Sequence, residues 1–135
     1  MKKYYLSLIV LLVAIIPCCA KSSKKDAFGM NFRSVSMDEG LKLMSQDKDY
    51  VLLDVRRPAE YAEGHIPGAI LHTNELMTKE NTELLLKNKD QTIYVYCRSG
   101  RRSKEASKKL VSYGYTNVIE IGGINDYSGE LRQGL

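Results

Sequence analysis

The sequence predicts one α/β domain with a mostly parallel central sheet flanked by helices. Apolar runs of strand length occur at 50–55, 92–96 and 118–121, and segments with helical signals separate them. Short runs dominated by apolar residues are typical of parallel strands covered on both faces. Strands that alternate with helices favour the α/β class. We expect this domain to occupy residues 32–135.

Local signals predict the helices between these strands. Ser36-Met37-Asp38-Glu39 has the form of a capping box, which opens a helix that runs to about Gln46. A second helix is expected from about 101 to 113, because its apolar residues share one face and Gly114 follows it. The other predicted pieces are two short helices and a short apolar segment at 59–63, 80–88 and 69–71.

Residues 1–20 have the features of an export signal. Two lysines precede an apolar run at 6–16, which is too short to span a bilayer comfortably and suits a bacterial secretory signal. We therefore expect an exported protein of the bacterial cell envelope, either periplasmic or lipid-anchored.

Two cleavage routes fit the end of this signal. Cys19 stands in a loose lipoprotein box, which makes it the candidate for lipidation and would leave a lipid-bearing cysteine at the mature N-terminus. Cys18-Cys19-Ala20 also fits an ordinary signal-peptidase site, so both routes stay open. The polar stretch at 21–31 predicts a flexible tether to the domain.

Charge and cysteine content exclude several classes of protein. The formal charge of +4 falls to +2 without the two lysines of the signal, which is too mild to indicate a nucleic-acid partner. Cys97 is the only thiol in the predicted domain, so it has no partner there for a disulfide. The sequence has no CxxC spacing and only two histidines, which argues against a metal site. We expect a monomer that meets a membrane only through an N-terminal lipid.

Cys97 stands where its thiol can act as a nucleophile. It ends the predicted strand at 92–96, and the carboxyl ends of parallel strands are where open α/β sheets bind ligands. The turn that follows leads into a helix N-terminus, whose backbone N–H groups can form an anion-binding cradle. Gly100 lets this turn curl, and three arginines add positive charge. Helix N-termini and cations stabilise a thiolate, so the pattern predicts a reactive cysteine beside an anion site.

Three blocks of the sequence resemble the rhodanese family. The segment 97–103, Cys-Arg-Ser-Gly-Arg-Arg-Ser, is similar to the C-R-S-G-x-R-S active-site loop of single-domain rhodaneses. The segment 53–69 resembles the family's D-x-R and E-[FY]-x-x-G-H-I-x-G-A elements, and 114–124 resembles its closing G-[FY]-x-x-V and G-G-[IV] elements. The resemblance covers about 32–127. One departure is Tyr127, which stands where the family often has tryptophan.

The resemblance implies a sulfurtransferase with a small rhodanese-like domain and no cofactor. Cys97 would take the outer sulfur of an anionic donor such as thiosulfate and pass it, as a persulfide, to cyanide or a thiol. The residues that would bind the substrate and the persulfide are Arg98, Ser99, Gly100, Arg101, Arg102 and Ser103. The supporting residues are Asp54 and Arg56, expected to form an ion pair that braces the loop, Glu60, expected in the same brace, and His65, expected in a structural turn.

Other functions share part of this pattern. A sulfur-relay or rhodanese-like binding protein that acts on a protein or thiol partner would keep the same loop, so the sequence leaves that alternative open. A cysteine phosphatase or arsenate reductase uses a C-x5-R loop, with an arginine six positions after the cysteine. Here that position is Ser103, and Arg102 falls one residue earlier, which disfavours the phosphatase class.

Overall fold

The computed structural model describes residues 32–135. The export signal, Cys19 and the tether predicted from the sequence lie outside the described residues. The described chain forms one five-stranded sheet, in which every paired neighbour is parallel and the order is β1-β5-β4-β2-β3. The strands are β1 (Arg33–Ser34), β2 (Tyr50–Asp54), β3 (Ile70–Leu71), β4 (Thr92–Cys97) and β5 (Val118–Gly123).

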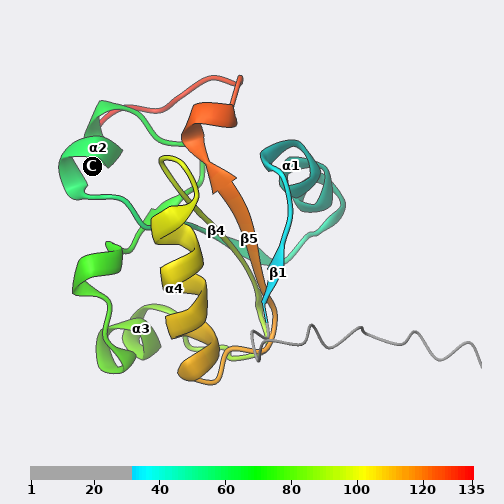
Figure 1. Cartoon of the computed structure of the whole chain (residues 1–135), viewed down its shortest axis with the longest axis vertical. Helices are drawn as coiled ribbons and strands as arrows, with labels where there is room; N and C mark the ends of the chain where they lie inside the picture. Colours follow the sequence, from blue (N-terminus) through cyan, green and yellow to red (C-terminus); the bar gives the residue numbers. More distant parts are fainter. Residues whose placement is uncertain (1–31) are drawn as a thin grey trace, which may run out of the picture.

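Helices cover both faces of this sheet, which confirms the predicted α/β class. Figure 1 shows α1 on one side and α3 with α4 on the other. The helices are α1 (Met37–Gln46), α2 (Pro58–Glu63), α3 (Lys79–Leu85) and α4 (Arg101–Ser112), with 3-10 turns η1 (Asn74–Leu76) and η2 (Ile124–Asp126). Within residues 32–135, no helix has the length and apolar character needed to cross a membrane.

The core has two apolar layers, one on each side of the sheet. Successive strand residues point to opposite faces, so Ile93 and Val95 of β4 pack toward α4, whereas Tyr94 and Tyr96 pack toward α1. Leu110 of α4 is fully buried in the first layer. The long helix therefore packs along the central strand β4, and this packing sets the direction of the helix that follows Cys97.

The helix α3 differs from its predicted range of 80–88. Thr78 accepts a hydrogen bond from the Asn81 N–H at 3.2 Å, so the helix begins at Lys79. The chain leaves the helical conformation at Leu86, whose side chain then enters the core. Leu84 and Leu85 still belong to α3, and Leu84 is 77% exposed. Leu86, the first residue after the helix, is the one that is deeply buried, so α3 ends three residues before the predicted position 88.

Tyr127 occupies the family's tryptophan position without disturbing the fold. Its ring is partly buried and packs against the apolar layer on the α1 side. Its hydroxyl donates to the Glu130 carbonyl at 3.2 Å. The ring thus supplies apolar contact while its polar tip finds a partner near the surface.

Candidate active site

The sulfur of Cys97 lies beneath a tight turn between β4 and α4. Cys97 is 1% exposed and is a free thiol. Gly100 precedes the first helical residue with φ of 108°, a left-handed conformation that strains any residue with a Cβ. Its N–H donates to Cys97 Sγ at 3.0 Å. The turn therefore directs a backbone donor, and the positive end of α4, at the sulfur.

Ser103 connects this sulfur to a buried carboxylate that the sequence analysis did not single out. Its Oγ lies 3.5 Å from Cys97 Sγ and donates to Glu120 Oε1 at 2.6 Å. Glu120 is 1% exposed and stands in the middle of β5. The available signal was an acidic residue inside the run 118–121, where every neighbour is apolar.

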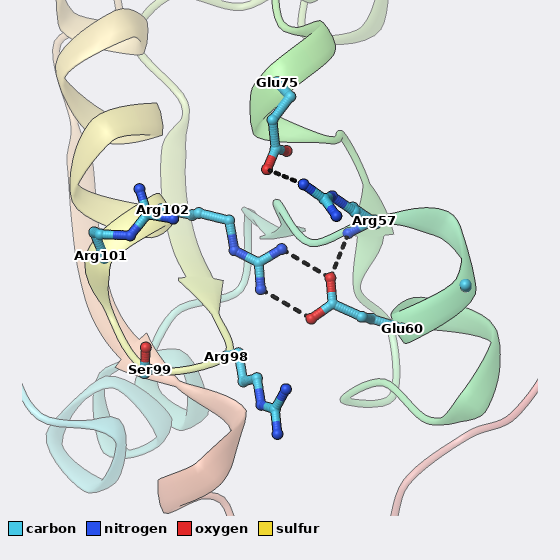
Figure 2. A pocket seen from close by; sticks show the side chains of 8 residues that line it. Arg57, Glu60, Glu75, Arg98, Ser99, Arg101 and Arg102 are labelled. Atoms are coloured by element: carbon cyan, nitrogen blue, oxygen red, sulfur yellow. Dashed lines mark hydrogen bonds and ion pairs between the residues drawn. The ribbon is translucent and has the colours of Figure 1, made fainter.

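A cavity of about 530 Å³ opens beside the turn, between the loop and α2 (Figure 2). Its walls carry four arginines and two glutamates, whereas the buried Cys97 is not among the residues that line it. The lining residues are Arg57, Ala59, Glu60, Glu75, Arg98, Ser99, Arg101 and Arg102. The structure thus brings four of the six predicted binding residues of the loop, Arg98, Ser99, Arg101 and Arg102, together with Glu60 around one cavity, whereas Gly100 and Ser103 do not line it.

The sequence predicts Glu60 in the same brace as Asp54 and Arg56. In the structure its carboxylate binds Arg102 instead. Two parallel hydrogen bonds link the Arg102 guanidinium to the Glu60 carboxylate, at 2.7 and 2.9 Å (Figure 2). The reason is the position of Glu60 in the first turn of α2, where it also accepts the Arg57 N–H at 3.0 Å. The pair therefore ties the first turn of α2 to the first turn of α4.

This pairing shifts the protonation of both partners. The hydrogen bonds from Arg102 are the largest cause that lowers the pKa of Glu60, from 4.5 to about 2, and the Arg57 N–H adds to them while burial opposes them. The same hydrogen bonds raise the pKa of Arg102 further above its ordinary value. Both groups are therefore charged at neutral pH, and Glu60 stays mostly charged well below its ordinary pKa of 4.5.

The Glu60–Arg102 pair predicts an acid-dependent part of the stability. Because the folded pKa of Glu60 is about 2 and its ordinary value is 4.5, the unfolded chain binds more protons between these pH values. The stabilisation is complete above pH 4.5 and is lost as the pH falls toward 2. We expect the free-energy difference of urea unfolding between wild type and Glu60→Gln to be constant at higher pH and to shrink in this window. Parallel curves down to the acid end would contradict the pairing.

Most other cations of the cavity also have acidic partners. Arg101 binds Glu105 at 2.8 Å on the exposed face of α4, and Arg57 lies 3.7 Å from Glu75. Arg98 differs, because its side chain makes no hydrogen bond or ion pair with any residue of the described range 32–135. Its guanidinium is thus the charge in the cavity wall that remains available to an anion.

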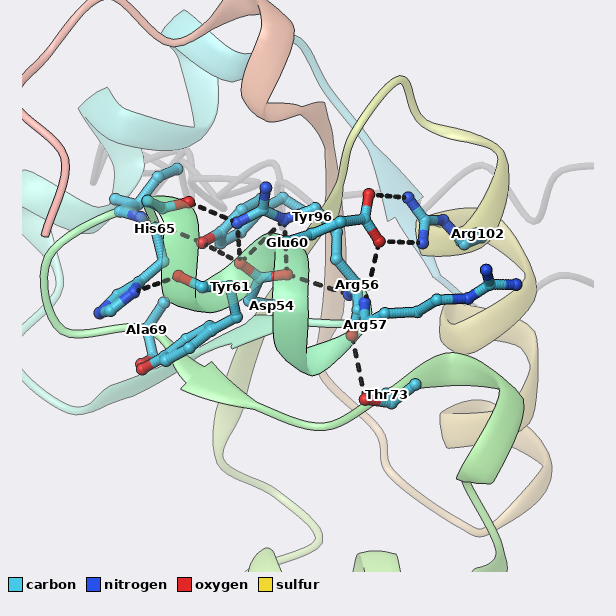
Figure 3. Close-up of polar contacts among 12 residues, drawn as sticks. Asp54, Arg56, Arg57, Glu60, Tyr61, His65, Ala69, Thr73, Tyr96 and Arg102 are labelled. Carbon is cyan, nitrogen blue, oxygen red and sulfur yellow. Dashed lines mark hydrogen bonds and ion pairs between the residues drawn. The ribbon is translucent and has the colours of Figure 1, made fainter. Parts of the chain in front are cut away.

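The expected ion pair of Asp54 and Arg56 is present and is buried (Figure 3). Arg56 donates to Asp54 Oδ2 at 2.7 Å and to the Gly64 carbonyl at 2.7 Å. The Tyr96 hydroxyl donates to the same carboxylate at 2.6 Å and accepts the Ile66 N–H at 3.1 Å. These contacts brace the turn after α2 against β2 and β4. The sequence predicts that this ion pair braces the loop at 98–103. In the structure the pair holds the turn at 64–66 instead.

His65 belongs to this turn, as expected. Its ring stacks on Tyr61 with centroids 3.7 Å apart and planes at 5°, and Nδ1 lies 2.9 Å from the Tyr61 carbonyl oxygen. Its backbone forms a bridge with Arg132 near the C-terminus. All of these contacts are structural and hold the turn.

Comparisons with known proteins identify the family. The sequence model of one protein family, the rhodanese-like domain, matches residues 37–130 of this chain. The chain belongs to the rhodanese-like family. It is 39% identical over 75 residues to the thiosulfate sulfurtransferase PspE of Escherichia coli (strain K12), which covers 55% of this chain and 70% of that protein.

Two further relatives support the same assignment. A protein named sulfurtransferase from Allochromatium vinosum is 36% identical over 80 residues, which cover 59% of this chain and 72% of the relative. The solved structure of a rhodanese with anions from E. coli is similar with a TM-score of 0.58 and 34% identity, over 63% of this chain and 99% of that chain. The relatives of this rhodanese-like chain therefore include sulfurtransferases.

Proposed function

We propose that this rhodanese-like chain is a sulfurtransferase that moves a sulfane sulfur from an anionic donor, such as thiosulfate, to cyanide or a thiol. The observation that carries the proposal is the setting of Cys97. Its sulfur receives the Gly100 N–H at the start of α4, next to a cavity with four arginines in its walls. Such a setting stabilises a thiolate and attracts an anion.

The proposed reaction has two steps that share Cys97. In the first, the thiolate attacks the outer sulfur of thiosulfate. The sulfur–sulfur bond of the donor breaks, its electron pair leaves with sulfite, and Cys97 becomes a persulfide. In the second, cyanide or a thiolate attacks the terminal sulfur of the persulfide, and the thiolate of Cys97 is released. Forming such a covalent intermediate divides one transfer between two substrates into two displacements.

The loop and the cavity have separate roles in this proposal. Backbone N–H groups of residues 98–103 hold the persulfide, with Gly100 as the donor already directed at the sulfur. Arg98 steers the donor, because its guanidinium has no partner among residues 32–135. Arg101 and Arg102 contribute less net charge, since Glu105 and Glu60 oppose them.

The test is to locate the transferred sulfur on the full chain. The protein is treated with thiosulfate, its thiols and persulfides are capped with an alkylating reagent, and trypsin then releases the peptide 90–98 for mass spectrometry. We expect Cys97 to gain one sulfur atom and to lose it when cyanide is added before capping. The Cys97→Ser variant is the matched control and should gain none. A Cys97 that is alkylated readily but gains no sulfur would contradict the proposal and favour a sulfur-relay or binding role.

A second arm of this experiment tests the class of donor, and in Arg98→Glu the peptide to be measured is 90–101, because trypsin does not cut after glutamate. Arg98→Glu should slow the gain of sulfur from thiosulfate about tenfold, within the range of electrostatic effects on association rates. The gain from an uncharged persulfide donor should change little. Arg101→Glu is the control, because it changes the charge by the same amount at another residue that lines the cavity. We expect it to have a smaller effect on the thiosulfate rate. Equal slowing with both donors would contradict the steering role of Arg98.

A further inference from the structure

Glu120 is a buried carboxylate that the proposed sulfur transfer does not use. It accepts three hydrogen bonds, all from neutral donors: Ser103 Oγ at 2.6 Å, the Gly122 N–H at 2.8 Å and Ser34 Oγ at 2.5 Å. No lysine, arginine or histidine of residues 32–135 forms an ion pair with it. Burying a charge without a counter-ion is costly, so this carboxylate depends on its three hydrogen bonds for stabilisation.

One hydroxyl separates this carboxylate from the sulfur of Cys97. Ser103 Oγ lies 2.6 Å from Glu120 Oε1 and 3.5 Å from Cys97 Sγ, so the sulfur and the carboxylate oxygen are no farther apart than these two distances together. Two negative charges at such a separation strongly disfavour each other. A serine hydroxyl both donates and accepts, so Ser103 can pass a proton between the two groups.

The other charged groups around the pair have partners or lie at the surface. Arg102 contributes positive potential at Cys97 but is bound to Glu60. The buried residues of α1, which covers the opposite face, are uncharged, and β1 reaches Glu120 only with the Ser34 hydroxyl. The remaining charged groups of the neighbouring elements are Arg33 of β1, Asp38, Glu39 and Lys42 of α1, Arg98 at the cavity, Asp54 of β2 with its partner Arg56, and Arg101, Lys104, Glu105, Lys108 and Lys109 of α4.

We propose that Cys97 and Glu120 form a coupled pair that carries one negative charge between them, with Ser103 as the bridge. When Cys97 is a thiol, Glu120 is a carboxylate. When Cys97 becomes a thiolate, its proton moves to Ser103 Oγ as the hydroxyl proton of Ser103 moves to Glu120 Oε1. The persulfide anion that forms from this thiolate leaves the proton on Glu120. The total number of protons in the pair stays at one, and the two serine hydroxyls reorient around the carboxylic acid.

The coupling has a consequence for reactivity. Backbone N–H groups and a helix N-terminus stabilise the thiolate, but a thiolate that is stabilised too strongly is a poor nucleophile. Glu120 opposes this stabilisation and keeps the sulfur nucleophilic. Glu120 is buried and is not among the residues that line the cavity, so it is a positioning residue that acts on Cys97 through Ser103. The persulfide part of this inference rests on the proposed sulfur transfer, whereas the thiolate part requires no sulfur donor.

The test compares wild type with Glu120→Gln, which keeps the shape and the acceptor oxygen but cannot be charged. The full chain is reacted with dipyridyl disulfide from acid to alkaline pH, and the modified peptide 90–98 is quantified by mass spectrometry. In the variant we expect the half-maximal rate at a lower pH, with a rate about tenfold higher near pH 5, because a like charge is removed. We expect the alkaline plateau to fall about threefold, because a more stable thiolate attacks disulfides more slowly.

The opposite signs of these two changes distinguish coupling from a structural role. Glu80→Gln removes an exposed carboxylate of α3. It should change neither the pH of the half-maximal rate nor the rate at the alkaline plateau. A variant profile that matches wild type, or one that falls equally at all pH values, would overturn the coupled pair.

A measurement on wild type covers the case in which Glu120→Gln does not fold. Infrared spectra near neutral pH should show the carbonyl band of one protonated carboxylic acid, and blocking Cys97 with an alkylating reagent should remove it. Absence of such a band at a pH where Cys97 reacts rapidly would overturn the proposal. Neither measurement uses a sulfur donor. A chain that shows both signatures but gains no sulfur from thiosulfate would therefore lose the proposed function and keep the coupled pair.

Discussion

Replacing Gly123 with alanine should slow persulfide formation at least about 100-fold, the cost of a displacement near 1 Å in an active site. Gly123 ends β5 directly against the loop that follows Cys97. A Cβ at this position would overlap the Arg98 carbonyl and lie 2.5 Å from the Ser99 backbone nitrogen. Because both obstacles are backbone atoms, the loop itself has to move. The N–H groups that we expect to hold the persulfide would then lose their alignment with the sulfur.

The measurement is the initial rate at which the peptide 90–98 gains sulfur, together with the melting temperature. Gly129→Ala is the matched control, because its Cβ would meet only the tip of the Tyr127 side chain, which can turn away. We expect that control to keep the wild-type rate. A Gly123→Ala chain with an unchanged rate and melting temperature would show that the close approach of β5 does not position the loop.

Removing the Asp54 carboxylate should destabilise the fold by about 3–5 kcal/mol, the usual cost of leaving one partner of a buried ion pair uncompensated. In Asp54→Ala, the Arg56 guanidinium stays buried without its counter-ion. The Tyr96 hydroxyl also loses the acceptor that it now reaches at 2.6 Å. Urea unfolding at neutral pH measures the loss, and we expect the free energy of unfolding to fall with little change in the denaturant slope.

Two variants make this prediction specific. Glu75→Ala removes the partner of an exposed arginine, Arg57, at 3.7 Å and should cost less than about 1 kcal/mol. Replacing both Asp54 and Arg56 with apolar residues should recover much of the loss, because no charge is then left buried. An Asp54→Ala chain that is no less stable than Glu75→Ala would contradict the structural role of the brace.

Features with a local cause could be predicted from the sequence. The strand at 92–97 and the helix after it follow from an apolar run, a glycine and a helical pattern that are adjacent in the chain, and the structure has them within one or two residues. The helix at 37–46 likewise follows from its cap, since Ser36 accepts the Glu39 N–H at 3.2 Å. The parallel order and the position of Cys97 at a strand end then follow from the alternation of strands and helices.

Features that depend on distant residues could not be predicted in this way. Ser34 and Glu120 meet only because β1 pairs with β5, which places them in register 86 residues apart. Glu60 and Arg102 are 42 residues apart, and their contact depends on how α2 is placed against α4. A sequence pattern names the charged residues but does not say which of them will pair. The proposed role of each loop residue in sulfur transfer stays a prediction.

Both outer strands of the sheet, β1 and β3, contain only two residues. The edge of a sheet exposes unpaired backbone N–H and C=O groups, on which a strand from another molecule can add. Two-residue edges offer few such groups in a row, and they border a sheet whose apolar central strands would otherwise favour aggregation. The domain is therefore protected against strand-to-strand association by the brevity of its outer strands, a property that would matter whenever many copies are crowded together.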